Sequence, residues 1–427
     1  MKTNNKTLRV FEYQNLRVND KINDLKFEEK HFKALSRYGY KTKQKYFTVG
    51  DKRITFCNYV GVIQVKGLTI EVLPKADKSK TDDKNSQSKW HDFLIDMLHV
   101  CKLIKLDSVS NARLRLKSAS ILDLYFEAFL DQVEYLYHNG LKKRYRRVED
   151  NLNKVKGRIV FNKHIVKNIV HKEKFYVENK IYDWDNKLNQ ILKKAILILN
   201  RLTTNHKFIS RIKNLLVSFE DIKEKNFSEK DFRRICFNRN TERYRYAIKL
   251  AELIILEYSP DLKGGRNDVL AILFDMNTLF EEYVYRIMRR ELVDDDFNIT
   301  RQNRKRFWGN KGMKPDIVVR KNNNDVVAVI DTKWKVLDSE KANPSDHDLR
   351  QVFTYSLYFE TKKAILLYPQ VDDFQEFKSG NYHPFKINEY EDSNRNCTLA
   401  FYDLFDPDNP TRLNKNLPYN IKTLIKN

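Results

Sequence analysis

The sequence predicts a multidomain α/β and α+β protein, with a β-rich and helical N-terminal part followed by a C-terminal α/β domain. Three observations lead to this prediction. Apolar and polar residues alternate within 1–77, apolar residues recur at helical spacing within 90–265, and both patterns follow one another within 268–427. The chain has 427 residues, of which 41% are apolar, so it is long enough for two or three domains and apolar enough to bury their cores.

The first 77 residues are expected to form a β-rich domain. The run YVGVIQVKGLTIEVLPK at 59–75 has two alternating stretches around Lys66 and Gly67, which predicts a hairpin. Residues 78–89 contain no apolar side chain and are expected to form a polar loop. The following region, 90–265, is expected to be mainly helical, with helices beginning at Trp90 and covering 121–141, 188–204 and 243–259.

The C-terminal domain is expected at 268–427, after a loop at 262–268 with the sequence LKGGRND. Its patterns predict a helix at 274–293 that is capped near Asp275 or Asn277. Two strands joined by a tight turn follow, then a helix at 347–360 and a last strand at 363–369.

The charge balance favours a polyanionic partner. The chain has 80 Lys and Arg against 57 Asp and Glu, a net charge of +23, and nucleic acid is the commonest such partner. An acidic lipid surface is the rival, but no long amphipathic helix with one basic face is apparent. Without a membrane-length apolar run, a hydrophobic N-terminal segment or a CxxC pair among its four cysteines, the chain is expected to be a reduced cytoplasmic protein without membrane association.

Two carboxylates and a lysine are expected to meet on the C-terminal strand hairpin. If 322–325 form a four-residue turn, Lys321 pairs with Val326, which places Asp316 opposite Asp331. The same register places Lys314 opposite Lys333, and Lys333 projects from the same face as Asp331 because strand side chains alternate.

Charges in such apolar strands are costly unless they bind something, and two close carboxylates repel unless a cation lies between them. Mg²⁺ is the expected cation, with Mn²⁺ as a substitute, because it takes one or two carboxylates, waters and a phosphate oxygen. Lys333 would then orient the attacking water and offset charge on the phosphoryl group. The alternative is an ordinary salt bridge between Lys333 and an aspartate at the end of a sheet, which the spacing alone leaves open.

Basic residues concentrate just before this hairpin. The segment RQNRKRFWGNKGMK at 301–314 mixes cations with Phe307 and Trp308, and it is interpreted as a DNA-contacting segment. The predicted DNA-binding cations are Arg304, Lys305, Arg306, Lys311 and Lys314. A second basic cluster, LKKRYRR at 141–147, could serve DNA or a protein partner.

The pair Pro315-Asp316, followed by Asp331-Thr332-Lys333, resembles the signature of PD-(D/E)XK nucleases, which have a restriction-endonuclease-like α/β fold. The resemblance implies that Asp316 and Asp331 hold the catalytic metal and that Lys333 assists the water. It also implies a metal-completing glutamate on the preceding helix, for which Glu281 is preferred to Glu282.

The spacing of Gln351 and Tyr355 is similar to the QxxxY pattern of several of these nucleases. This similarity implies that Gln351 supports the catalytic site and that Tyr355 supports it or contacts the DNA backbone.

Four further segments, 59–75, 140–165, 185–195 and 275–284, are similar to segments of the McrC family. This resemblance implies a nuclease subunit of a modification-dependent restriction system whose N-terminal half docks on the AAA+ GTPase McrB and stimulates it. The C-terminal half would cut double-stranded DNA, while McrB recognises methylated cytosine. The chain has no GxxxxGK[ST] loop, so it is expected to bind no nucleotide itself.

The predicted function is therefore a Mg²⁺-dependent DNA endonuclease subunit that works with an McrB-like GTPase. Dimerisation through the assembly is expected, because cutting both strands generally requires two nuclease centres. One alternative is a stand-alone restriction endonuclease of the same fold. Another is a non-catalytic, DNA-binding activator subunit in which the carboxylates are structural.

Overall fold

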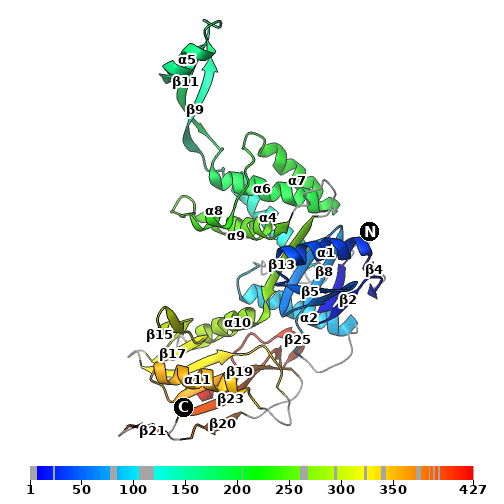
Figure 1. Cartoon of the computed structure of the whole chain (residues 1–427), viewed down its shortest axis with the longest axis vertical. Helices are drawn as coiled ribbons and strands as arrows, with labels where there is room; N and C mark the ends of the chain where they lie inside the picture. The colour runs from blue at the N-terminus through cyan, green and yellow to red at the C-terminus, as the bar shows by residue number, and fades with distance from the viewer. Residues whose placement is uncertain are drawn as a thin grey trace. The chain divides into compact units, whose positions relative to one another are not determined.

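The computed structural model describes residues 7–426 except 23–24, 77–83, 105–119, 204, 260–267, 293–295, 322–324, 338–342, 372–376, 384, 388–389 and 393–394. The chain forms two compact units (Figure 1). The first unit combines Met1–Ile121 with Leu273–Asn427, and the second comprises Leu122–Ile272. Most of the loop expected at 262–268 lies outside the described residues. None of the described helices has the length and hydropathy to cross a membrane.

The N-terminal part of the first unit is β-rich, as predicted. Its elements are β1 (Thr7–Phe11), β2 (Asn15–Arg17), β3 (Lys21–Ile22), β4 (Leu25–Lys26), α1 (Glu29–Lys41), β5 (Phe47–Gly50), β6 (Arg53–Phe56), β7 (Tyr59–Val65) and β8 (Leu68–Leu73). The predicted β7–β8 hairpin is confirmed, with Val65 paired to Leu68. Lys66 and Gly67 both have positive φ, 48° and 77°, as a two-residue primed turn requires. The strand order continues β1-β8-β7-β13, where β13 is Val269–Asp275.

The polar loop expected at 78–89 is partly wrong, because helix α2 (Lys84–Val100) begins inside it. Residues 78–83 lie outside the described part of the chain. In the first turns of α2, Lys84, Asn85 and Ser88 are exposed and the buried side chain, Gln87, is polar, before Trp90 enters the core. An exposed helical turn needs no apolar side chain, so the polar composition does not separate a loop from a helix here.

A six-stranded sheet is the centre of the C-terminal part, and β17, β19, β20 and β23 of it are labelled in Figure 1. Its strand order is β14-β17-β18-β19-β23-β20. Its strands are β14 (Phe297–Arg301), β17 (Ile317–Lys321), β18 (Val326–Thr332), β19 (Lys363–Gln370), β20 (Lys378–Asn381) and β23 (Asn396–Asp403). The pairs β18–β19 and β19–β23 are parallel and the other pairs are antiparallel. The expectation that 363–369 is the last strand is wrong, because β23 is buried beside it. Such a doubly buried strand lacks polar alternation.

Two predicted helices pack against this sheet. Helix α10 (Met276–Glu291) begins at Asp275, whose side chain accepts a hydrogen bond from the Thr278 amide, so the predicted cap is confirmed. It contacts β14 and β18, and helix α11 (Asp346–Tyr358) contacts β18, β19 and β23. The remaining elements are β15 (Lys305–Trp308), β16 (Lys311–Met313), β21 (Phe385–Ile387), β22 (Tyr390–Asp392), β24 (Phe405–Asp406), β25 (Asn409–Leu413) and α12 (Tyr419–Lys426).

The register of the β17–β18 hairpin agrees with the prediction at its apolar centre and differs at its turn. Ile317 lies opposite Ile330, and Val318 lies opposite Val329, as predicted. Near the turn Arg320 pairs with Val326, so the predicted Lys321–Val326 pair is wrong. The cause is a β-bulge in β18, which bends the strand next to the turn and leaves the far end in register.

The second unit contains the helices predicted at 121–141, 188–204 and 243–259, and a sheet that the mainly helical assignment of 90–265 does not include. The helix predicted from Trp90 is α2 of the first unit. The helices of the second unit are α4 (Ile121–His138, whose first residue belongs to the first unit), α5 (Phe161–Lys167), α6 (Lys187–Leu202), α7 (His206–Ser218), α8 (Glu229–Arg233) and α9 (Arg245–Leu256). Its strands are β9 (Arg144–Leu152), β10 (Arg158–Ile159), β11 (Phe175–Asp183) and β12 (Tyr258–Ser259). The basic cluster at 141–147 forms the start of β9, which pairs with β11 along its whole length.

Candidate functional site

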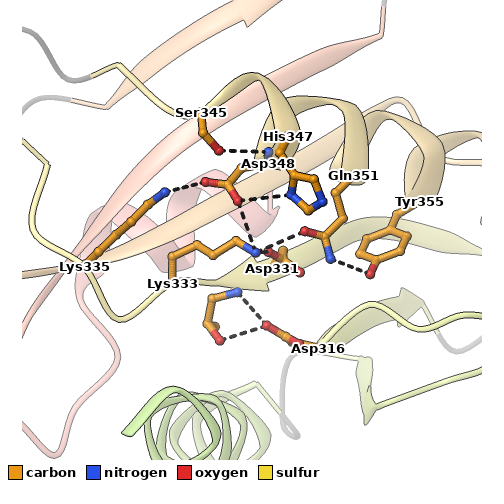
Figure 2. Close-up of polar contacts among 10 residues, drawn as sticks. Asp316, Asp331, Lys333, Lys335, Ser345, His347, Asp348, Gln351 and Tyr355 are labelled. Carbon is orange, nitrogen blue, oxygen red and sulfur yellow. Dashed lines mark hydrogen bonds and ion pairs between the residues drawn. The ribbon is translucent and has the colours of Figure 1, made fainter. Parts of the chain in front are cut away.

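The two predicted carboxylates lie at adjacent strand ends. Asp331 is the penultimate residue of β18 and only 2% exposed, and Asp316 directly precedes β17. Since Ile317 opposes Ile330, Asp316 and Asp331 are the next pair along the hairpin. Asp316 Oδ2 accepts hydrogen bonds from the amide and hydroxyl of Thr332, at 2.8 and 2.9 Å (Figure 2). The β-sheet ladder therefore fixes both carboxylates on neighbouring strands.

Both carboxylates are electrostatically strained. Burial, together with the charge of Asp316, raises the pKa of Asp331 to about 6. Burial also raises the pKa of Asp316, against the hydrogen bonds from Thr332. A divalent cation with oxygen ligands would relieve this repulsion, and Mg²⁺ needs only one or two carboxylates with waters. No three His, Cys, Asp or Glu side chains in the described part of the chain are close enough to form a complete protein metal cluster.

Lys333 lies beside the carboxylates, held by three side chains (Figure 2). Its Nζ is 2.7 Å from Asp331 Oδ2 and 3.4 Å from Asp348 Oδ1, and it donates to Gln351 Oε1 at 3.1 Å. Burial would lower the pKa of Lys333, but the charges of Asp331 and Asp348 outweigh it and raise that pKa. Lys333 therefore stays an ammonium, which can donate hydrogen bonds and offset negative charge but cannot act as a base.

One face of α11 supports the lysine. Gln351 accepts from Lys333 and donates from Nε2 to Tyr355 Oη at 2.8 Å (Figure 2). Tyr355 is only 7% exposed and belongs to the core beneath α11. The DNA contact predicted for Tyr355 is therefore not supported by its position, which is that of a side chain holding Gln351.

Asp348 is a site residue that the sequence analysis missed. It is buried, and its carboxylate accepts from Lys335 at 2.5 Å while also pairing with Lys333. Burial would raise the pKa of Asp348, but the hydrogen bonds from Lys335 and Ser345 and the charge of Lys333 outweigh it and lower that pKa. The available signal was its spacing of three residues before Gln351, which places both on one helix face.

Glu281 and Glu282 of α10 have different environments. Glu282 forms ion pairs with Arg286, at 2.6 Å, and with Arg301. Glu281 accepts a hydrogen bond from Gln302 Nε2 at 3.0 Å. Burial, with the nearby charge of Asp316, raises the pKa of Glu281 to about 7. Glu281 is thus the glutamate whose pKa the charge of Asp316 affects, although no three-carboxylate metal cluster is formed among the described residues.

The predicted DNA-contacting segment forms a hairpin of β15 and β16. At its tip Trp308 is 71% exposed, Phe307 is exposed, and Lys311 Nζ lies 5.6 Å from the Trp308 ring centre. Lys305 donates to the Tyr358 carbonyl at 2.6 Å, which connects this hairpin to the end of α11. Arg304 donates to the carbonyl of Asn310 within the hairpin. The other predicted cations, Arg306, Lys311 and Lys314, are exposed.

The comparison with family models places the chain in a class of restriction-system proteins. A family model described as "McrBC 5-methylcytosine restriction system component" matches residues 54–369, and the chain belongs to this family.

Two solved structures resemble the chain. One is a refined half-complex from a tetradecameric assembly of Thermococcus gammatolerans McrB AAA+ hexamers with bound McrC, at 20% identity, 98% coverage of both chains and a TM-score of 0.64. The other is the Thermococcus gammatolerans McrBC complex, at 21% identity, 67% coverage of this chain, 88% of that chain and a TM-score of 0.49. The first similarity confirms the multidomain fold. A search of curated proteins gave no match.

The raised pKa of Asp331 predicts a pH-dependent stability. A carboxyl group whose pKa is higher in the folded state stabilises the fold below its unfolded pKa, and this stabilisation is lost as the pH rises through the folded pKa. We expect the unfolding free energy of the metal-free protein to fall by about 2 kcal/mol between pH 4 and pH 6 from this group. Added Mg²⁺ should restore stability above pH 6, as measured by thermal unfolding at several pH values.

Asp403→Asn is the matched control, because burial also raises the pKa of Asp403 on the nearby strand β23. This variant should keep the Mg²⁺ response, whereas Asp331→Asn should lose it. An equal Mg²⁺ response in both variants would contradict metal binding by Asp331.

Proposed function

We propose that this protein is the Mg²⁺-dependent DNA endonuclease subunit of an McrBC-like restriction complex. The observation that supports it most is the pair of strained carboxylates, Asp316 and Asp331, beside the ammonium of Lys333. A PD-(D/E)XK nuclease needs this combination on two adjacent strands. Membership of the restriction-system family and the basic hairpin next to the site agree with DNA as the substrate.

In the proposed mechanism Asp316 and Asp331 would hold the cation, and Glu281 of α10 would be the neighbouring carboxylate. When bound, Mg²⁺ would supply charge stabilisation at the phosphate and a more acidic water. Lys333 orients the attacking water and donates to the phosphate as negative charge develops there. Gln351 and Asp348 fix the Lys333 ammonium, and Tyr355 fixes Gln351. The positions of these side chains are set before the substrate arrives, which lowers the cost of reaching the transition state.

We also propose that the partner is an McrB-like AAA+ GTPase that docks on the second unit. The similar solved chain belongs to an assembly of McrB hexamers with bound McrC. In the second unit, five apolar side chains on and just after α5 are each more than half exposed: Phe161, Ile165, Val166, Ile169 and Val170. A contiguous exposed apolar segment is typical of a protein-binding surface.

Asp331→Ala tests the nuclease assignment. We expect cleavage of methylated plasmid in Mg²⁺, partner and GTP to fall by at least roughly 10²-fold, because the cation loses a ligand and Lys333 loses an ion pair. Stimulation of the partner's GTPase should be unchanged. Asp325→Ala, directly before the first residue of the same strand, is the matched control and should cut normally.

Omitting components separates the alternatives. Cleavage that requires both the partner and GTP supports the subunit role, whereas cleavage by this chain alone would establish a stand-alone endonuclease. GTPase stimulation without any cleavage by the wild-type chain would establish a non-catalytic activator.

The exposed hairpin cations should contribute affinity without sequence preference. Replacing both Arg306 and Lys311 by Ala should weaken DNA binding equally for methylated and unmethylated duplexes. The slope of log K against log salt should become shallower by roughly 0.9 for each lost phosphate contact. Fluorescence anisotropy at several salt concentrations measures both quantities. Lys21→Ala, an exposed cation in the β-rich part, should leave the slope unchanged, and an unchanged slope in the double variant would exclude the hairpin from the DNA interface.

The docking assignment is tested by a double variant, Val166→Asp with Val170→Asp. We expect the affinity for the purified GTPase partner to fall at least about tenfold, because two apolar side chains are lost from the interface. Val217→Asp is the matched control, since Val217 on α7 is 74% exposed, as is Val166. Calorimetric titration should give wild-type affinity for this control. Equal losses in both proteins would contradict docking through the α5 segment.

A further inference from the structure

Two side chains of the N-terminal β-rich part are hydrogen-bonded to the segments that carry the nuclease residues. The first is Glu12, which directly follows β1 and is only 5% exposed. Its Oε1 accepts from the indole Nε1 of Trp334 at 2.8 Å, and from the Lys75 amide at 3.0 Å. The Glu12 amide donates to the Leu73 carbonyl at 2.9 Å, so this carboxylate is fixed by its own sheet. Trp334 is the residue immediately after Lys333.

The second side chain is Asn58, which precedes β7. Its Nδ2 donates to Asp275 Oδ2 at 2.8 Å, and its carbonyl accepts from the Met276 amide at 2.9 Å. Asp275 is also the N-cap of α10, where its Oδ1 accepts from the Thr278 amide at 2.9 Å. Asn58 therefore fixes the start of the helix that presents Glu281.

An aromatic contact joins these two connections. The Trp334 ring packs edge-on against Phe280, with ring centres 5.4 Å apart, and Phe280 is fully buried. Phe280 is the residue immediately before Glu281. The neighbours of Lys333 and of Glu281 thus contact each other, and each segment is hydrogen-bonded to the same β-rich part.

A carboxylate is an expensive choice for a purely structural contact here. Removing a charged carboxylate from water costs several kcal/mol unless its partners compensate. Burial raises the pKa of Glu12 to about 7, so the compensation is incomplete at neutral pH. The directional bond to the indole is what this position supplies beyond packing.

We propose that Glu12 and Asn58 are positioning residues of the nuclease centre, holding Lys333 through Trp334 and Glu281 through Asp275. This inference rests on the proposed nuclease function. It assigns the N-terminal β-rich part a direct role in cleavage geometry, in addition to any partner docking.

The first test measures cleavage with the full-length chain, its GTPase partner and Mg²⁺. Glu12→Ala should lower kcat by roughly tenfold to a hundredfold with an unchanged KM for DNA, because the reacting groups are misplaced while DNA contacts are retained. Glu12→Gln should have a kcat within about threefold of the wild-type value, because its amide oxygen still accepts the hydrogen bond from the indole. Trp334→Phe keeps an aromatic ring but lacks the N–H, and should lower kcat in the otherwise wild-type chain. In the Glu12→Ala variant, the same substitution should cause no additional loss of kcat.

Glu71→Gln is the matched control, because Glu71 is a fully buried carboxylate of β8 that bonds to Arg9 and the Ile121 amide. This control should change thermal stability but not kcat. A wild-type kcat in Glu12→Ala would overturn the proposal. An equal loss of kcat in Glu71→Gln would also overturn it, because the effect would then follow general destabilisation.

A second measurement does not depend on catalysis. The Thr332 amide bonds to Asp316, and the Lys333 amide donates to the Leu367 carbonyl at 2.9 Å, so both report on the end of β18. In metal-free protein, Glu12→Ala should accelerate hydrogen exchange at least about tenfold in a peptide covering 326–337, with no change in Glu71→Gln. If the wild-type chain cuts no DNA, the proposed nuclease function is wrong. The exchange data still show whether Glu12 holds the end of β18 through Trp334. Unchanged exchange in Glu12→Ala would overturn this connection.

Discussion

The repulsion between the buried carboxylate of Asp331 and the partly buried carboxylate of Asp316 is the constraint on which the site depends. Asp316 and Asp331 are held in opposition by strand pairing, and burial makes ionisation of both costly. The Lys333 ammonium, which is shared between Asp331 and Asp348, offsets part of this cost. The ammonium of Lys333 can offset the negative charge of the two aspartates only if it is held in a fixed position. Gln351, Tyr355 and Thr332 provide the hydrogen bonds that keep this arrangement in place.

The central hairpin could be predicted from the sequence because apolar strands and isolated charges are local signals. Asp316 and Asp331 stand at equivalent distances from the turn, so an approximate turn was sufficient to oppose them. The bulge near Val326 could not be predicted, because Val326–Ile330 is apolar throughout and matches either register. Strand β23 is buried on both faces, so its sequence lacks the alternation of apolar and polar residues from which a strand is predicted.

The parts of the site that the sequence did not reveal depend on tertiary contacts. Glu281 and Glu282 are adjacent on one helix, and their roles are distinguished by their partners in the fold: Arg301 pairs with Glu282, whereas Gln302 donates a hydrogen bond to Glu281. Asp348 resembles any acidic residue in the first turn of a helix until Lys333 and Lys335 are placed beside it. Tyr355 has the spacing of a ligand-binding residue, but its burial gives it a supporting position.

The first unit is discontinuous in sequence, and this affects when its contacts can form during synthesis. Its two segments are separated along the chain by the whole second unit, and Glu12 is 322 residues from Trp334. Because a chain leaves the ribosome from its N-terminus, the β-rich part waits for the last third of the protein before its contacts are complete. Such distant contacts also fold slowly. A nascent chain therefore lacks the hydrogen bond from Trp334 to Glu12 until its last third has been synthesised.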